Sequence, residues 1–149
     1  MKSVIVCTSV SHGNTRRVAD TMARVLGAAV VSPGEADLAE LAAADLVGFG
    51  SGVYLGRLHP NLTGLVRALP NVRGRAFVFA TSGLPELRPA PYTRPLVRRL
   101  AAKGFRVEGT FTCRALDTWG PFGLVGGVNR QRPDAGDLAA ARAFAERLR

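Results

Sequence analysis

Residues 3–15, SVIVCTSVSHGNT, decide the fold class because they join two kinds of local pattern. The run from Ser3 to Cys7 is short, apolar and rich in β-branched residues, which is typical of a strand buried on both faces of a parallel sheet. A helical pattern begins near Thr15, because apolar residues recur at i, i+4, i+7 and i+8 between Val18 and Leu26. This closely spaced strand and helix predict the start of an α/β domain.

The same alternation continues along the rest of the chain. Short apolar runs predict strands over 28–31, 45–50, 76–80 and 107–113, and helical stripes predict helices over about 38–44, 61–69, 93–103 and 138–148. Asn61 is the predicted N-cap of the third helix. The last strand alternates apolar and polar residues, so we expect it to be half-exposed at an edge. Five strands, each followed by a helix, predict a single doubly wound α/β domain over residues 1–149.

The composition fits one compact domain whose net positive charge could bind a partner. The chain has 149 residues, of which 47% are hydrophobic and 21% charged, and this argues against disorder or tandem domains. Its net charge is +9, from 20 Lys and Arg against 11 Asp and Glu, which first suggests a nucleic-acid partner. The basic residues form no run longer than two, so a dispersed surface charge is the simpler interpretation, with an anionic partner left open.

The cysteines and the apolar stretches bear on cellular location. Cys7 and Cys113 are too few for a disulfide framework and are predicted to be small apolar residues within strands. No signal-peptide h-region follows Lys2, and no apolar stretch approaches membrane-spanning length. No spacing of Cys and His typical of a metal site occurs. We therefore expect a cytoplasmic protein without membrane insertion and without a metal.

The segments after the strands are the places to look for a ligand site, because ligands of doubly wound sheets bind outside the carboxyl ends of the strands. The segment from Thr8 to Thr15 brings hydroxyl groups, a glycine and an asparagine to a helix start, where backbone N–H groups favour an anion. It lacks the Walker and the G-x-G-x-x-G patterns. A tyrosine phosphatase would need Arg at position 13, where Gly13 stands. The segment predicts a phosphate site, with a polar helix-capping turn as the alternative.

Four segments together resemble one known family. The run Ser11-His12-Gly13-Asn14-Thr15 resembles the phosphate-binding loop of flavodoxins. The segments Gly48–Tyr54, Thr81–Gly83 and Asp117–Arg130 resemble, in the same order, the other loops of small flavodoxin-like proteins. The resemblance implies a flavodoxin-like five-stranded parallel sheet of order 2-1-3-4-5, with helices on both faces, and FMN as the cofactor.

The resemblance also assigns roles to residues of these loops. It places the FMN phosphate against the first loop, where His12 could add an imidazole to the hydroxyl donors. It places Tyr54 on one face of the flavin ring, and Trp119 is a candidate for the other side. The implied cofactor-binding residues are Ser9, Ser11, His12, Gly13, Asn14, Thr15, Ser51, Gly52, Val53, Tyr54, Thr81, Ser82, Gly83 and Trp119.

Electron transfer through FMN is the first functional hypothesis, because a carrier needs no catalytic acid, base or nucleophile and no side chain here stands out as one. The alternative is an FMN-dependent NAD(P)H:quinone or flavin oxidoreductase, or a quinone-coupled oxidase of the same fold. Its anionic substrate could be bound by loop arginines, namely Arg57, Arg88, Arg130 and Arg132.

A third hypothesis is a module without flavin that binds nucleic acid or an acidic protein, although the intact Gly-Asn-Thr run argues against it. The predicted phosphate loop carries no Lys or Arg before Arg16. The charge of +9 is therefore interpreted as a surface for redox partner proteins with an acidic docking face, and not for nucleic acid.

Overall fold

The computed structural model describes residues 1–8, 13–54, 57–82, 92–114 and 133–149, and the side chains of Tyr54 and Arg114 are outside this description. The strands are β1 (Ser3–Thr8), β2 (Ala29–Val31), β3 (Leu46–Tyr54), β4 (Arg57–Leu58), β5 (Arg75–Ser82) and β6 (Arg106–Arg114). The helices are α1 (Asn14–Leu26), α2 (Leu38–Ala43), α3 (Pro60–Ala68), α4 (Arg94–Ala102) and α5 (Ala135–Glu146).

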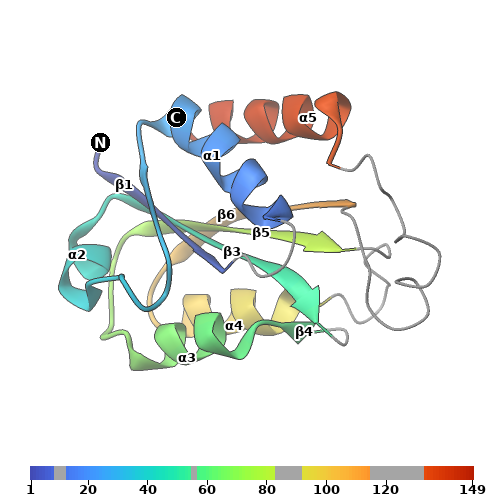
Figure 1. Cartoon of the computed structure of the whole chain (residues 1–149). Coiled ribbons are helices and arrows are strands. Elements are labelled where there is room, and N and C mark those ends of the chain that lie inside the picture. The colour runs from blue at the N-terminus through green and yellow to red at the C-terminus, as the bar shows by residue number, and fades with distance from the viewer. Residues whose placement is uncertain (9–12, 55–56, 83–91, 115–132) are drawn as a thin grey trace.

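Five strands form a parallel sheet in the order β2-β1-β3-β5-β6, and the short β4 pairs antiparallel with the end of β3. The predicted order 2-1-3-4-5 is confirmed, because it describes these five parallel strands counted without β4. Helices α1 and α5 cover one face of the sheet, and α3 and α4 cover the other (Figure 1). The last strand, β6, lies at an edge and alternates between half-buried and exposed residues, as predicted.

Both faces of the sheet are buried, which explains the continuous apolar runs of the central strands. In β1, Val4 and Val6 belong to the core on the α3 and α4 side, whereas Ile5 and Cys7 belong to the core on the α1 and α5 side. Successive strand residues point to opposite faces, so a strand covered on both sides needs apolar residues at every position. The sheet is therefore held in place between two helical layers.

Two glycines of β3 make room for two phenylalanine rings of β5. Gly48 pairs with Phe77 and Gly50 pairs with Phe79 in the parallel register. A Cβ added at Gly48 would lie 2.3 Å from Cζ of Phe77, and one added at Gly50 would lie 2.0 Å from Cζ of Phe79. The rings therefore occupy the space that side chains of β3 would fill on the α1 and α5 face.

Two boundaries differ from the sequence prediction. Asn61 is not the N-cap of α3; His59 is, and its Nδ1 accepts a hydrogen bond from the Asn61 N–H at 3.1 Å. The helix starts two residues earlier because Pro60 has the backbone φ of a helix and no N–H that needs a partner there. The third strand also continues past residue 50 to Tyr54, so four predicted loop residues belong to the sheet.

Candidate functional site

The candidate site begins at the carboxyl edge of the sheet, where hydroxyl side chains end three adjacent strands. Thr8 ends β1 and is in register with Ser51 of β3, and Thr81 of β5 is in register with Gly52. The side chains of Thr8, Ser51 and Thr81 are buried. Parallel strands bring their carboxyl ends to one edge, so these polar groups, distant in sequence, lie together there.

The first turn of α1 is built as a donor site. Its N-cap is Gly13, whose φ of 64° is the left-handed conformation that favours glycine. The N-cap residue Gly13 has no side chain with which to cap this turn, and the turn contains no acidic residue. The next two residues, Asn14 and Thr15, are buried against the sheet. The positive end of the helix therefore receives no cap from its own N-cap residue and has no carboxylate in its first turn.

A hydroxyl pair joins this turn to the end of β5. The Oγ1 atoms of Thr15 and Thr81 lie 2.8 Å apart, and either can donate the hydrogen bond. Both side chains are buried, with 3% of Thr15 and 4% of Thr81 exposed. The hydrogen bond thus fixes the start of α1 relative to the point where the chain leaves β5.

Two further hydrogen bonds attach the start of α3 to the same edge from the opposite face. Thr8 Oγ1 donates to Oδ1 of Asn61 at 2.7 Å. Ser51 Oγ accepts the N–H of His59 at 3.0 Å and donates to the carbonyl of Gly52 at 2.6 Å. Both helix starts are therefore anchored to strand-end hydroxyls.

The end of β3 folds back on itself as a short hairpin. Val53 pairs with Leu58, and Tyr54 pairs with Arg57, in antiparallel register. Leu58 is buried, whereas Arg57 is exposed. The hairpin therefore holds the backbone of Val53 and Tyr54 at the carboxyl edge. Both residues belong to the segment that the resemblance assigns to the flavin ring.

The structure brings together many, but not all, of the residues assigned from sequence. Gly13, Asn14 and Thr15 start α1, and the strand-end residues Ser51, Gly52, Val53, Thr81 and Ser82 lie at the same edge of the sheet. Tyr54 is placed by its backbone alone. The predictions for Ser9, Ser11, His12, Gly83 and Trp119, and for the arginines Arg88, Arg130 and Arg132, lie outside the described residues. Sequence reasoning missed Thr8 as a buried anchor and Asn61 as its partner.

The buried side chains at this edge are polar and uncharged. Among the described residues at the ends of β1, β3 and β5 and in the first turns of α1 and α3 there is no Asp or Glu. Cys7, one residue before the end of β1, is buried on the α1 face, and this burial raises the pKa of its thiol to about 12. The thiol is therefore neutral at physiological pH and unsuited to act as a nucleophile.

Within the described residues, no cluster of three or more His, Cys, Asp or Glu side chains could hold a metal ion. None of their helices combines the length and the apolar character needed to cross a bilayer.

Comparison with known proteins gives the family. The model of the flavodoxin domain matches residues 5–114. An uncharacterized protein of Methanocaldococcus jannaschii is 33% identical over 148 residues, which cover 99% of this chain and 98% of the relative. The matched residues include the carboxyl-terminal part of β1, the start of α1 and the strand ends described above. The chain therefore belongs to the flavodoxin domain family.

Solved structures share the fold at low sequence identity. A flavodoxin from the domain Archaea superposes with a TM-score of 0.72 at 18% identity, covering 99% of this chain and 96% of that one. Flavodoxin 1 of Bacillus cereus gives a TM-score of 0.71 at 19% identity, with coverage of 97% and 95%. A flavodoxin, WrbA-like protein of Agrobacterium tumefaciens gives 0.66 at 20% identity, with coverage of 99% and 94%. These likenesses establish the fold.

Proposed function

We propose that this protein binds FMN at the carboxyl edge of the sheet and carries electrons between partner proteins in the cytoplasm. The observation that carries the proposal is the start of α1, where Gly13 takes a left-handed conformation, has no side chain to cap the first turn, and is followed by a turn without an acidic residue. This turn lies beside buried hydroxyl groups in a chain of the flavodoxin domain family. FMN would supply the redox chemistry, since its ring accepts and donates electrons.

The residues present fit FMN in chemical kind. A phosphate needs N–H and O–H donors and the absence of nearby carboxylates, and the start of α1 offers both. In this proposal the backbone around Gly13 and the side chains of Asn14 and Thr15 hold the phosphate. The backbone of Gly52 and Val53 and the end of β5 at Ser82 border the ring. Thr15 is itself held in place by its hydrogen bond with the hydroxyl of Thr81, the residue before Ser82.

The carrier role is favoured over catalysis by what the edge lacks. Among the described residues of this edge, His59 is the one histidine, and its Nδ1 accepts the N–H of Asn61. That bond commits one ring nitrogen of His59 to capping α3. These residues therefore offer no strong candidate for a general acid or base that would act on a substrate.

The direct test is the absorbance spectrum of the purified protein, followed by heat release and identification of the flavin. We expect a yellow protein that releases one FMN per chain. The apoprotein should take up FMN but bind riboflavin much more weakly, because riboflavin lacks the phosphate. A colourless protein that fails to quench the fluorescence of added FMN contradicts the proposal.

A second candidate function is an FMN-dependent oxidoreductase that takes electrons from NAD(P)H. The exposed guanidinium of Arg57 favours it, because β4 brings this residue to the carboxyl edge next to the backbone of Tyr54. An arginine there could bind the phosphate of a pyridine nucleotide. Rapid reduction of the bound flavin by NADPH without a reductase, slowed by Arg57→Ala, supports this function. Inertness toward NADPH and NADH excludes it in favour of the carrier.

A further inference from the structure

The positive charge of this protein is concentrated on one helical layer. Residues 57–75 and 92–106 contain nine Arg and Lys and no Asp or Glu. The remainder of the chain holds the other eleven basic residues and all eleven acidic ones, so its formal charge is zero. We call the two segments the basic layer; they include α3 and α4 with the turns at their ends, β4, and the first residues of β5 and β6. One of the nine cations, Arg75 of β5, instead reaches the α5 side, where its Nη2 donates to the carbonyl of Leu148 at 2.7 Å. The whole net charge of +9 therefore belongs to the basic layer.

Five arginines of the basic layer are exposed and have no acidic partner among the described residues: Arg57, Arg67, Arg73, Arg98 and Arg99. The opposite layer differs, since on α1 Arg16 pairs with Asp20 at 2.9 Å. Within the basic layer, Arg75 and Arg106 both pair with Glu108 of β6, at 2.8 and 3.0 Å. The five arginines thus give up no internal ion pair when they meet a partner.

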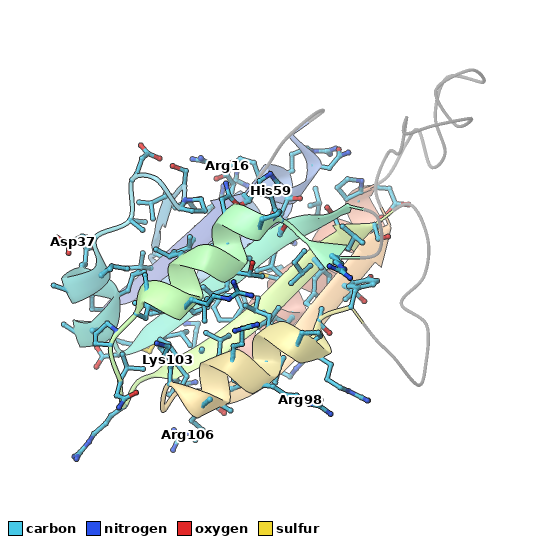
Figure 2. The ribbon with its side chains drawn as sticks, turned by 90° about the horizontal axis from the view of Figure 1, so that it is seen from below. Arg16, Asp37, His59, Arg98, Lys103 and Arg106 are labelled. Carbon is cyan, nitrogen blue, oxygen red and sulfur yellow. The ribbon has the colours of Figure 1, made fainter. Side chains whose placement is uncertain are left out.

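The basic layer is also a firm surface. Lys103, just after α4, donates through Nζ to the carbonyls of Arg67 and Leu69 at 2.9 and 2.6 Å, which ties the end of α4 to the end of α3. The inner faces of both helices are buried in one core, which includes Val66 and Leu100. Figure 2 shows α3 and α4 side by side in front of the sheet, with Arg98 and Arg106 labelled beside α4. Cations held on packed helices lose little freedom when they bind.

The chemistry of the basic layer favours carboxylates of a folded protein over other anions. Among the described residues, Met1 is the one exposed large hydrophobic side chain, and it lies outside the layer. The layer therefore presents no exposed aromatic ring on which bases of a single strand could stack, and no apolar side chain to enter a bilayer. Spread guanidinium groups on a firm surface suit the dispersed carboxylates of an acidic protein face.

We propose that the basic layer is a docking surface for the acidic face of a partner protein. The proposal stands apart from FMN binding, because it rests on charges of α3 and α4 and not on the start of α1. Outside the layer, basic and acidic residues are equal in number along the chain, so the excess of positive charge lies in the layer. A partner is therefore steered toward it before contact.

The test uses an acidic plant-type [2Fe–2S] ferredoxin as the probe, at low ionic strength. We expect the backbone amide signals of α3 and α4 to shift on titration, and those of α1 and α5 to stay in place. The double variant Arg98→Glu/Arg99→Glu should weaken binding by at least about tenfold. The matched control, Arg24→Glu/Arg142→Glu, changes the net charge equally at exposed positions of α1 and α5 and should weaken binding by no more than about threefold.

Several outcomes would overturn the proposal. One is the absence of ferredoxin binding, and another is an equal effect of the two double variants. A third is tighter binding to duplex DNA, or to phosphatidylcholine vesicles containing phosphatidylglycerol, than to the ferredoxin, which would assign the layer to a nucleic acid or a membrane. FMN titration of the same variants separates this result from the proposed function, because neither pair touches the candidate site.

Discussion

The hydroxyl oxygens of Thr15 and Thr81 meet at 2.8 Å and join the first turn of α1 to the end of β5. The two residues are 66 positions apart in the chain, and both are buried. In the proposed function one end of this pair borders the phosphate of FMN and the other borders its ring. The hydrogen bond therefore couples two parts of the candidate site that belong to different βα units.

Replacing Thr81 by Val should disturb both stability and cofactor binding. The variant keeps the shape of the side chain but leaves the buried hydroxyl of Thr15 without this partner, which costs about 1–3 kcal/mol. We expect urea unfolding to show that loss and FMN affinity to fall by roughly tenfold, or about 1.4 kcal/mol. Thr81→Ser restores the hydroxyl and should remain close to the parent protein. Equal FMN affinity in all three proteins would contradict the coupling.

Gly13→Ala should weaken FMN binding through backbone conformation alone. A Cβ at this position meets no atom within 4 Å, so crowding is not the cause. The left-handed φ of 64° costs an alanine about 1–2 kcal/mol. Gly13→Asn should be milder, since asparagine tolerates this conformation. Fluorescence titration with FMN and thermal unfolding distinguish the series, and an alanine variant that binds FMN better than the asparagine variant would count against this explanation.

Gly48→Ala should strongly destabilise the fold, because the added methyl group collides with the ring of Phe77. Overpacking of a buried site costs about 1–3 kcal/mol. Gly64→Ala is the matched control: Gly64 lies within α3, nothing lies within 4 Å of its missing Cβ, and it is exposed. That substitution should raise stability by about 0.5–1 kcal/mol. Chemical unfolding measures both, and similar effects at the two glycines would refute the packing argument.

The buried thiol of Cys7 should resist alkylation until the protein unfolds. Burial raises its pKa from 9.0 to about 12, so in the folded state the reactive thiolate is scarce at pH 9. In a Cys113→Ser variant, iodoacetamide at pH 9 should label Cys7 slowly in buffer and quickly in denaturant. The thiol ionises at lower pH in the unfolded chain, so its contribution to stability is lost as pH rises between 9.0 and about 12. Rapid labelling of the folded variant would disprove this burial.

The sequence pattern was sufficient for the parallel strands and their helices, because each buried strand is a short apolar run. It failed at the end of β3, where Ser51 and Gly52 have little strand propensity of their own. Their extended conformation depends on pairing with β5, including Gly52 with Thr81, and on the return of β4. Such long-range pairing leaves no local signal.

The position of the site in the fold could be predicted from the sequence, but the hydrogen bonds within it could not. The strand ends and the Gly-Asn-Thr run pointed to the correct edge of the sheet. The pairing of Thr8 with Asn61 spans 53 residues, and no pattern in either segment announces it. Asn61 was assigned to the N-cap by residue preference alone. Its side chain is instead engaged by Thr8, and His59 caps the helix.

The rings that fill the space over Gly48 and Gly50 make two pairs of positions depend on each other across β3 and β5. A larger residue can enter position 48 only together with a smaller one at position 77, and the same holds for positions 50 and 79. Mutation should therefore move through these pairs in compensating steps. Sequences that diverge from this one are expected to exchange glycine and phenylalanine across the two strands while the total volume between the helical layers stays constant.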